Sequence, residues 1–261
     1  MSQARVLIVA GSDSGGGAGI QADIKTVTCL GGYAMTAVTA VTVQNALGVR
    51  GIHVVPGDVV AAQMRACIDD TGADVVKIGM PGDAGLSEAV AEVLRGVECP
   101  VVLDPVMVAT SGDRLLEDDA LWALVEHLVP RATVITPNLP ELMELTETEI
   151  EDAADMLLAA QELLDRGPRA VLAKGGHLPG DRLTDWLVWR GGQRGFSEDR
   201  IDGRDTHGTG CTLASGLAVS LAQGLVLEDA VVRARAFVRQ GLLQAPGLGR
   251  GHGPLGFYPF E

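Results

Sequence analysis

Short apolar runs alternate with segments of helical periodicity along almost the whole chain. The short runs, rich in Val, Ile and Ala, predict buried strands at residues 5–10, 35–43, 75–79, 101–104, 133–136 and 170–174. Between them, apolar residues recur at the spacing of one helix face, which predicts helices at residues 18–30, 58–70, 87–95, 118–128, 139–145, 150–165, 209–223 and 227–244. This alternation predicts a mainly parallel sheet with right-handed crossovers.

The rhythm changes between residues 182 and 201, where two short strands flank Gly191 and Gly192. A glycine pair between strands is typical of a tight turn, so we expect a small hairpin at the edge of the sheet. No internal repeat, low-complexity tract or linker-like segment divides the sequence. We therefore expect residues 1–261 to form a single α/β domain of three layers, with helices on both faces of the sheet.

The composition fits this architecture. Hydrophobic residues make up 47% of the chain, with 34 glycines and only 3% aromatic residues, which predicts a core of Val, Ala and Leu packed around glycine turns. The formal net charge of −14 argues against nucleic acid or an anionic membrane as a partner. A bound phosphate must therefore be held by backbone groups, a few lysines and a metal ion.

The cysteines indicate a reducing compartment. Cys29, Cys67, Cys99 and Cys211 form no C-x-x-C pair and show no metal-ligand spacing with histidine. The apolar run at residues 6–10 is too short for a secretion signal, and no segment approaches the roughly 18 uninterrupted apolar residues of a membrane span. We therefore expect free thiols and a cytoplasmic location.

Polar and glycine residues follow the predicted strands. In a parallel sheet the ligand site lies outside the carboxyl ends of the strands, so these residues are expected to share one rim. They are residues 11–19, here called the first glycine loop, then Gln44, Met80, Asp104, Asn138 with Glu141, and Lys174. The first glycine loop lacks the Lys-Ser/Thr of a P-loop and the spacing of a dinucleotide fingerprint, which favours a loop whose backbone lines a small flat ligand.

Residues 205–212, here called the anion loop, lie where the predicted helix 209–223 begins. A helix start leaves backbone N–H groups unpaired and partially positive, and Gly208 and Gly210 let that backbone approach a ligand closely. We expect the amides of Gly208, Thr209 and Gly210 to hold a transferring phosphate. Cys211, with a pKa lowered by the helix start, would take a proton from the attacking hydroxyl. The alternative is an ordinary glycine-rich loop with a small buried cysteine.

Two acids and a lysine complete this chemistry. Asp104 and Glu141 lie at neighbouring strand ends and are expected to hold Mg²⁺ directly or through water. Lys174 ends an apolar strand and is expected to reach nucleotide phosphates as a point charge. For Glu141 the alternative is a cap of the helix that starts after Asn138. Anion-binding amides, metal-holding acids, a lysine and a base are the parts of a phosphoryl-transfer site.

Three further side chains are candidates for the acceptor pocket. Asp23 lies on the apolar face of the helix at residues 18–30 and leans toward the rim, which favours ligand contact over complementation of the helix dipole. Gln44 offers one acceptor and two donors in one plane, which matches the ring nitrogen and amine edge of an aminopyrimidine. Met80 could supply an apolar face for the ring, or could be an ordinary core residue.

The motifs at these positions resemble those of the hydroxymethylpyrimidine and phosphomethylpyrimidine kinases of thiamine biosynthesis, in the ribokinase-like superfamily. The matching segments follow the family order, at residues 10–13, 15–26, 43–45, 77–80, 104–107, 136–141, 174–177, 205–212 and 251–254. The resemblance implies a three-layer αβα fold and an ATP-dependent enzyme. Its substrate would be 4-amino-5-hydroxymethyl-2-methylpyrimidine, converted first to the monophosphate and then to the diphosphate. The resemblance also implies a homodimer.

The same resemblance implies roles for individual residues. The pyrimidine would be lined by Gly11, Ala18, Asp23, Gln44, Met80, Val106 and Cys211, and the anion hole would be the backbone of residues 208–211. Mg²⁺ and the ATP phosphates would be served by Asp104, Glu141 and Lys174. Two alternatives remain open, namely a pyridoxal or pyridoxine kinase on the same scaffold and a pyrimidine sensor that binds without turnover. Gln44 and Met80 favour the aminopyrimidine, and the set of metal acids, lysine and thiol favours catalysis.

Overall fold

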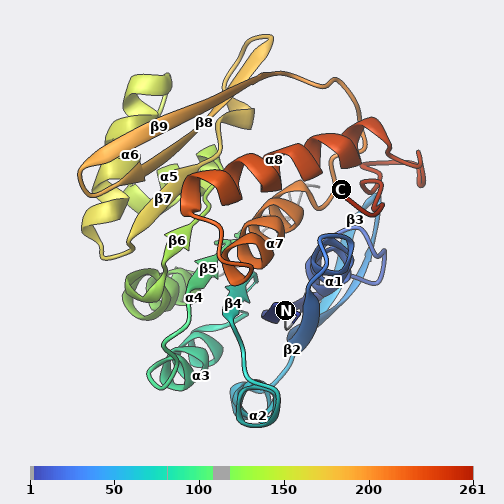
Figure 1. The fold of residues 1–261 in the computed structure, drawn as a ribbon, viewed down its shortest axis with the longest axis vertical. Helices are drawn as coiled ribbons and strands as arrows, with labels where there is room; N and C mark the ends of the chain where they lie inside the picture. The colour runs from blue at the N-terminus through green and yellow to red at the C-terminus, as the bar shows by residue number, and fades with distance from the viewer. Residues whose placement is uncertain (1–2, 81, 108–117, 261) are drawn as a thin grey trace.

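A computed structural model describes residues 3–80, 82–107 and 118–260. Within these ranges a nine-stranded sheet has the order β3-β2-β1-β4-β5-β6-β7-β8-β9 (Figure 1). Its strands are β1 Arg5–Ser12, β2 Tyr33–Asn45, β3 Gly48–Val54, β4 Val75–Ile78, β5 Val101–Leu103, β6 Val134–Ile135, β7 Ala170–Ala173, β8 Arg182–Trp189 and β9 Gly192–Asp199. Pairing is parallel from β2 through β7, whereas β3 at one edge and β8 and β9 at the other run antiparallel to their neighbours.

Helices connect the strands and end close to the positions that the hydrophobic pattern predicts. They are α1 Gly19–Cys29, α2 Gly57–Asp70, α3 Ala84–Leu94, α4 Asp118–Ala123, α5 Leu139–Thr146, α6 Ala153–Asp165, α7 Thr209–Ala222 and α8 Leu227–Leu243. A π-helical turn at Leu124–Leu128 continues α4. None of the helices in the described part of the chain is long and apolar enough to cross a membrane.

Helices cover both faces of the sheet (Figure 1). On one face of the sheet, α1, α7 and α8 form a hydrophobic core with Val6 and Ile8 of β1. On the other face, α2 to α6 form a second core with Leu7 and Val9 of the same strand. Successive residues of a strand point to opposite faces, so a strand buried on both faces reads as an uninterrupted apolar run. The expected three-layer α/β fold with a mainly parallel sheet is confirmed.

The two edges of the sheet differ in how well the sequence predicts them. The expected hairpin is present as β8 and β9, which are joined at Gly191 with a φ of 97°. The pattern does not predict β3, because Arg50 and Gly51 interrupt its apolar residues and none of its residues is buried. β3 nevertheless matters for the site, since its pairing extends β2 to Asn45 and sets Gln44 opposite Val49.

Candidate active site

A cavity of about 670 Å³ opens at the carboxyl ends of the parallel strands. Its walls come from the first glycine loop, the ends of β2, β4, β5 and β7, the start of α5 and the anion loop. All the sequence-predicted site residues except Asp23 line it, namely Gly11, Ala18, Gln44, Met80, Asp104, Val106, Glu141, Lys174, Gly208, Thr209, Gly210 and Cys211.

The anion loop meets the first glycine loop at the start of α7. Gly208 is the N-cap residue, with a φ of 86° and a ψ of 8°, a left-handed conformation that favours glycine. A Cβ at this position would come within 1.9 Å of the Gly17 carbonyl oxygen. No side chain caps the helix. The Thr209 amide donates to the Thr206 carbonyl oxygen at 3.3 Å, so the helix start offers an anion its remaining first-turn amides.

Lys174 faces the same helix start. Its Nζ lies 3.2 Å from Asp104 Oδ1 and 3.9 Å from Glu141 Oε2, and a Cβ on Gly210 would lie 3.3 Å from that nitrogen. Burial lowers the pKa of Lys174, but the two carboxylates raise it by more, so the pKa lies above its ordinary value. The structure therefore sets a lysine cation beside the first turn of α7.

The Asp104 carboxylate is only partly satisfied. Its Oδ1 accepts hydrogen bonds from Thr136 Oγ1 at 3.1 Å and from Lys174 Nζ. Its Oδ2 is buried and has no hydrogen-bond partner among the described residues. A buried carboxylate oxygen without a partner is unfavourable until a ligand completes it, and such an oxygen fits a Mg²⁺ ion.

Glu141 both caps α5 and faces the cavity. Its Oε2 accepts from the Asn138 amide at 2.7 Å, and its own amide donates to Asn138 Oδ1 at 2.9 Å, which forms a capping box. The helix-cap alternative is therefore correct, and the same side chain still lines the cavity. Burial raises the pKa of Glu141 to about 7, with Lys174 opposing the shift and Asp104 adding to it.

This pKa predicts a pH dependence of stability in the absence of Mg²⁺. Between pH 4.5, the ordinary glutamate value, and about pH 7, the folded protein keeps a proton on Glu141 that the unfolded chain has released. The free energy of unfolding is therefore expected to fall as the pH rises through this window. Denaturant titrations in EDTA across the window measure the slope. Glu141→Gln should flatten it, the exposed control Glu149→Gln should leave it unchanged, and an equal slope in both variants would contradict the assignment.

The structure corrects the expectation for the Cys211 thiol. Burial raises the pKa of Cys211 to about 12, although the Lys77 ammonium and a hydrogen bond from the Gly19 amide lower it. The sequence reveals the helix start, which by itself favours the thiolate, but not how deeply the sulfur lies. In the ligand-free protein at neutral pH, Cys211 is therefore a thiol and not the expected thiolate.

Asp23 also departs from its expected role. The apolar helix face is buried as predicted, but the Asp23 carboxylate is 0% exposed and is absent from the cavity wall. Lys77 Nζ donates to both of its oxygens at 3.0 and 2.9 Å, and Ser215 Oγ donates at 2.7 Å. Burial lowers the pKa of Lys77, but Asp23 raises it by more, so the lysine is charged. Asp23 therefore binds Lys77 from behind the cavity wall and does not line the cavity itself. Lys77 does line the cavity, and the sequence did not single it out as a site residue.

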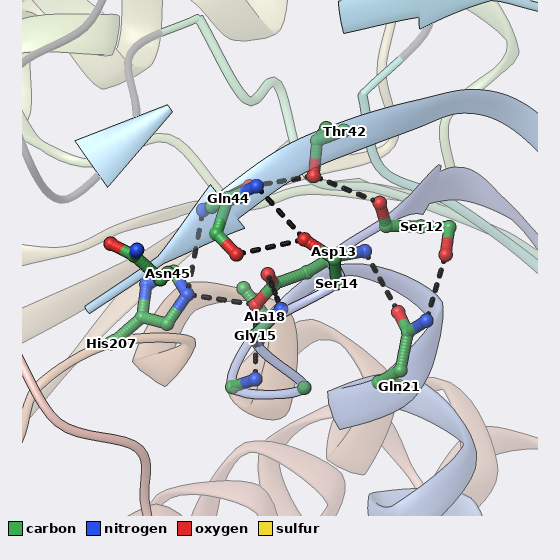
Figure 2. A network of polar contacts seen from close by, with 12 residues as sticks. Ser12, Asp13, Ser14, Gly15, Ala18, Gln21, Thr42, Gln44, Asn45 and His207 are labelled. Carbon is green, nitrogen blue, oxygen red and sulfur yellow. Dashed lines mark hydrogen bonds and ion pairs between the residues drawn. The ribbon is translucent and has the colours of Figure 1, made fainter. Parts of the chain in front are cut away.

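Asp13 lies at the centre of a network of polar contacts (Figure 2) and lines the cavity. Its Oδ1 accepts from the Gly15 amide at 2.7 Å, and its Oδ2 accepts from the amides of Gly17 at 2.9 Å and Ala18 at 2.8 Å. His207 Nε2 lies 2.9 Å from the same Oδ2. Burial raises the pKa of Asp13, but hydrogen bonds from His207 and the loop amides outweigh it, so the pKa lies below its ordinary value.

Gln44 lies beside this network at the end of β2 (Figure 2). Its Oε1 accepts from Thr42 Oγ1 at 3.1 Å, and its Nε2 lies 3.5 Å from His207 Nε2. The sequence motifs contain Asp13 and His207 but give them no role. The signal that could have found Asp13 is an aspartate directly before a glycine-rich turn, where its carboxylate can bind the following amides.

The cavity continues past Lys174 between the β8–β9 hairpin and α8. Leu183, Ile201, Val238 and Leu242 give this part an apolar lining. The sequence pattern does not reveal it, because the residues come from three separate segments, namely β8, the loop after β9 and α8.

A buried ion pair holds the loop after Lys174 in this region. The Gly175 amide donates to Asp185 Oδ1 at 2.9 Å, and Asp185 Oδ2 lies 3.4 Å from Arg235 Nε. Arg235 therefore ties α8 to the loop that carries the site lysine.

Known proteins are similar to this chain in sequence and in fold. The family model of phosphomethylpyrimidine kinase matches residues 13–256. The hydroxymethylpyrimidine/phosphomethylpyrimidine kinase of Streptomyces coelicolor is 48% identical over 250 residues, which cover 96% of this chain and 93% of that protein. The phosphomethylpyrimidine kinase structure from Clostridium difficile 630 is 36% identical with a TM-score of 0.82, covering 91% of this chain and 98% of that one.

A pyridoxal kinase is also similar. The ADP complex of the Bacillus subtilis enzyme is 33% identical with a TM-score of 0.91, covering 98% of each chain. The ribokinase-like fold is thus shared with a nucleotide-bound kinase. The resemblance drawn from the motifs is confirmed, and the chain belongs to the hydroxymethylpyrimidine/phosphomethylpyrimidine kinases, a family of phosphotransferases.

Proposed function

We propose that this enzyme transfers the γ-phosphoryl group of ATP to the hydroxymethyl oxygen of 4-amino-5-hydroxymethyl-2-methylpyrimidine and then to the phosphate of the product, in thiamine biosynthesis. One observation carries the proposal. A single cavity joins the Gln44 side chain to the Gly208–Cys211 helix start, where Lys174 and Asp104 converge. An acceptor ring and a transferring phosphate can therefore occupy adjoining parts of one site.

The residues divide the chemistry between them. In the first transfer the hydroxymethyl oxygen bonds to the γ-phosphorus, the bond from that phosphorus to the β–γ bridging oxygen breaks, and ADP leaves. The hydroxyl proton passes to the Cys211 sulfur once the thiol has ionised. Burial opposes that ionisation, and the Lys77 charge partly offsets this effect. The first-turn amides of α7 and the Lys174 cation stabilise the charge on the transferring group.

Mg²⁺ belongs to the same proposal. Asp104, through its unpartnered Oδ2, and Glu141 would hold the ion, which when bound neutralises phosphate charge. The described ranges hold no cluster of three or more His, Cys, Asp or Glu residues arranged for a metal. This agrees with an ion that takes one or two carboxylates and completes its shell with phosphates and water.

Product analysis with the hydroxymethylpyrimidine, ATP and Mg²⁺ tests the function. We expect the monophosphate to form and then convert to the diphosphate. Binding without an ATP-dependent product would revive the sensor alternative. The similarity to pyridoxal kinase makes pyridoxal the competing acceptor, and a higher kcat/KM for pyridoxal than for the pyrimidine would reverse the assignment.

Gln44→Leu is expected to weaken pyrimidine binding by about 10- to 100-fold, because a buried donor–acceptor pair on the substrate loses its partner. The kcat at saturating pyrimidine should change much less. Calorimetric titration of the pyrimidine in the absence of ATP measures the affinity. Gln63→Leu, a change at a glutamine on α2 that is not part of the cavity wall, is the matched control. Unchanged affinity in Gln44→Leu would remove Gln44 from the pocket.

We further propose that residues 1–261 act as one domain within a cytoplasmic homodimer. The family resemblance supports the dimer, as do exposed apolar side chains on the β2–β3 edge, Val41, Val43 and Ile52. Analytical ultracentrifugation should give twice the chain mass of 27.1 kDa, and a single-chain mass at assay concentration would refute the dimer.

A further inference from the structure

The anion loop carries the proposed phosphate-binding amides, and their position depends on the contacts that the loop makes with the body of the protein. Gly208 has no side chain, and the helix it caps has no side-chain cap hydrogen bond. Amides that stabilise a transition state must be held within a fraction of an ångström of their working position. Some other contact must therefore set the place of this loop.

His207, directly before the N-cap glycine, supplies that contact on one side. Its Nε2 lies 2.9 Å from Asp13 Oδ2, and both side chains are buried (Figure 2). The same Asp13 oxygen accepts the amides of Gly17 and Ala18. One carboxylate therefore joins the anion loop to the first glycine loop, at the point where Gly208 approaches the Gly17 carbonyl.

The C-terminal segment holds the same histidine from the other side. The His207 amide donates to the Gly253 carbonyl at 3.1 Å, and His207 forms a parallel bridge with Pro254. A Cβ on Gly253 would lie 1.9 Å from Asp205 Oδ1, so this approach requires glycine. The Gly-His-Gly-Pro motif at residues 251–254 thereby gains a physical role.

We propose that His207 is a positioning residue for phosphoryl transfer: Asp13 and the C-terminal segment clamp it, and it in turn places the Gly208–Cys211 amides against the acceptor pocket. The inference rests on the function proposed above. It assigns the histidine an action on the transition state through the loop, with no requirement that the imidazole touch the substrate.

A pair of substitutions tests the clamp. His207→Leu removes the donor to Asp13, and we expect kcat to fall about 100-fold, the effect of a misplacement of about 1 Å, while pyrimidine affinity changes little. In His207→Gln the amide nitrogen lies the same number of bonds from Cα as Nε2 and can again donate to Asp13, so its kcat should return to within about fivefold of the parent. His53→Leu, at an exposed histidine on β3, is the control for loss of a histidine.

A double-mutant cycle separates positioning from direct substrate contact. If His207 acts through Asp13, then Asp13→Asn should lower kcat much less in the His207→Leu background than in the parent. Additive losses, or a loss confined to KM, would overturn the inference, and so would equal kcat values in His207→Leu and the parent.

A second variant tests the contact between His207 and the C-terminal segment. It keeps the proposal testable if His207→Leu does not fold. Gly253→Ala should displace the carbonyl that accepts the His207 amide, because the added Cβ clashes with Asp205 Oδ1. We expect kcat to fall about tenfold and the melting temperature to fall, with the protein still folded at the assay temperature. Normal kcat in Gly253→Ala would remove the C-terminal segment from the clamp.

The outcomes separate the clamp from the proposed function. If the parent protein itself makes no ATP-dependent product, the proposed function fails. If the parent is active and His207→Leu is equally active, only the clamp is refuted.

Discussion

Replacing Cys211 with alanine is expected to lower kcat for the first phosphorylation by about 10³-fold, within the range that a general base contributes. The second phosphorylation should lose far less, because its acceptor is a phosphate oxygen that is already ionised near neutral pH. Pyrimidine affinity should change little, since the proposed role of the thiol is to accept a proton and not to bind the ring. Single-turnover assays started from the hydroxymethylpyrimidine and, separately, from its monophosphate measure the two losses.

The thiol chemistry adds a pH signature. Because burial raises the pKa of Cys211 to about 12 in the ligand-free protein, the ionised fraction rises with pH across the neutral range. The rate of the first phosphorylation should therefore rise with pH, and Cys211→Asp, with a base that is already ionised, should flatten this rise. Cys67→Ala is the matched control, because Cys67 lies outside the cavity wall. Equal losses in both phosphorylations of Cys211→Ala would dismiss the thiol as the base.

Asp104→Asn is expected to weaken Mg²⁺ activation and to lower kcat/KM by about 100-fold, because several kcal/mol of charge stabilisation depend on the ion. The amide oxygen can still accept hydrogen bonds from Thr136 and Lys174, as Oδ1 does now, so the local structure should persist. The buried Oδ2 that has no partner among the described residues is replaced by an amide nitrogen, which cannot bind a cation. A Mg²⁺ titration of the rate at fixed ATP measures the change.

The control for this variant is an aspartate outside the site whose carboxylate oxygen accepts a hydrogen bond. Asp83 caps α3 by accepting the Leu86 amide, and asparagine caps a helix about as well as aspartate, so Asp83→Asn should leave both kcat and Mg²⁺ dependence intact. Partial recovery of Asp104→Asn at high Mg²⁺ would agree with the assignment. A Mg²⁺ dependence identical to the parent would remove Asp104 from the metal site.

The layout of the fold could be predicted because it depends on local patterns. Runs such as residues 6–10 are apolar at every position, as expected for a strand that helices cover on both faces, and a glycine follows this run where the chain turns. β3 escaped prediction for the converse reason: it is an exposed edge strand, so few of its side chains need to be apolar. Its existence depends on pairing with β2, which is a non-local contact.

In the site too, some features follow from the local sequence and others depend on contacts between distant residues. The order of motifs along the chain determined the family and the three-layer α/β fold. It also placed every predicted site residue except Asp23 on the cavity wall, because the carboxyl ends of parallel strands must share one rim. Only the tertiary structure decided what each charged group meets there. It pairs Asp23, behind the cavity wall, with Lys77 on that wall, raises the pKa of the Cys211 thiol through burial, and joins Asp13 to His207. These outcomes depend on burial and on partners far away in sequence, and electrostatic energies change steeply with both.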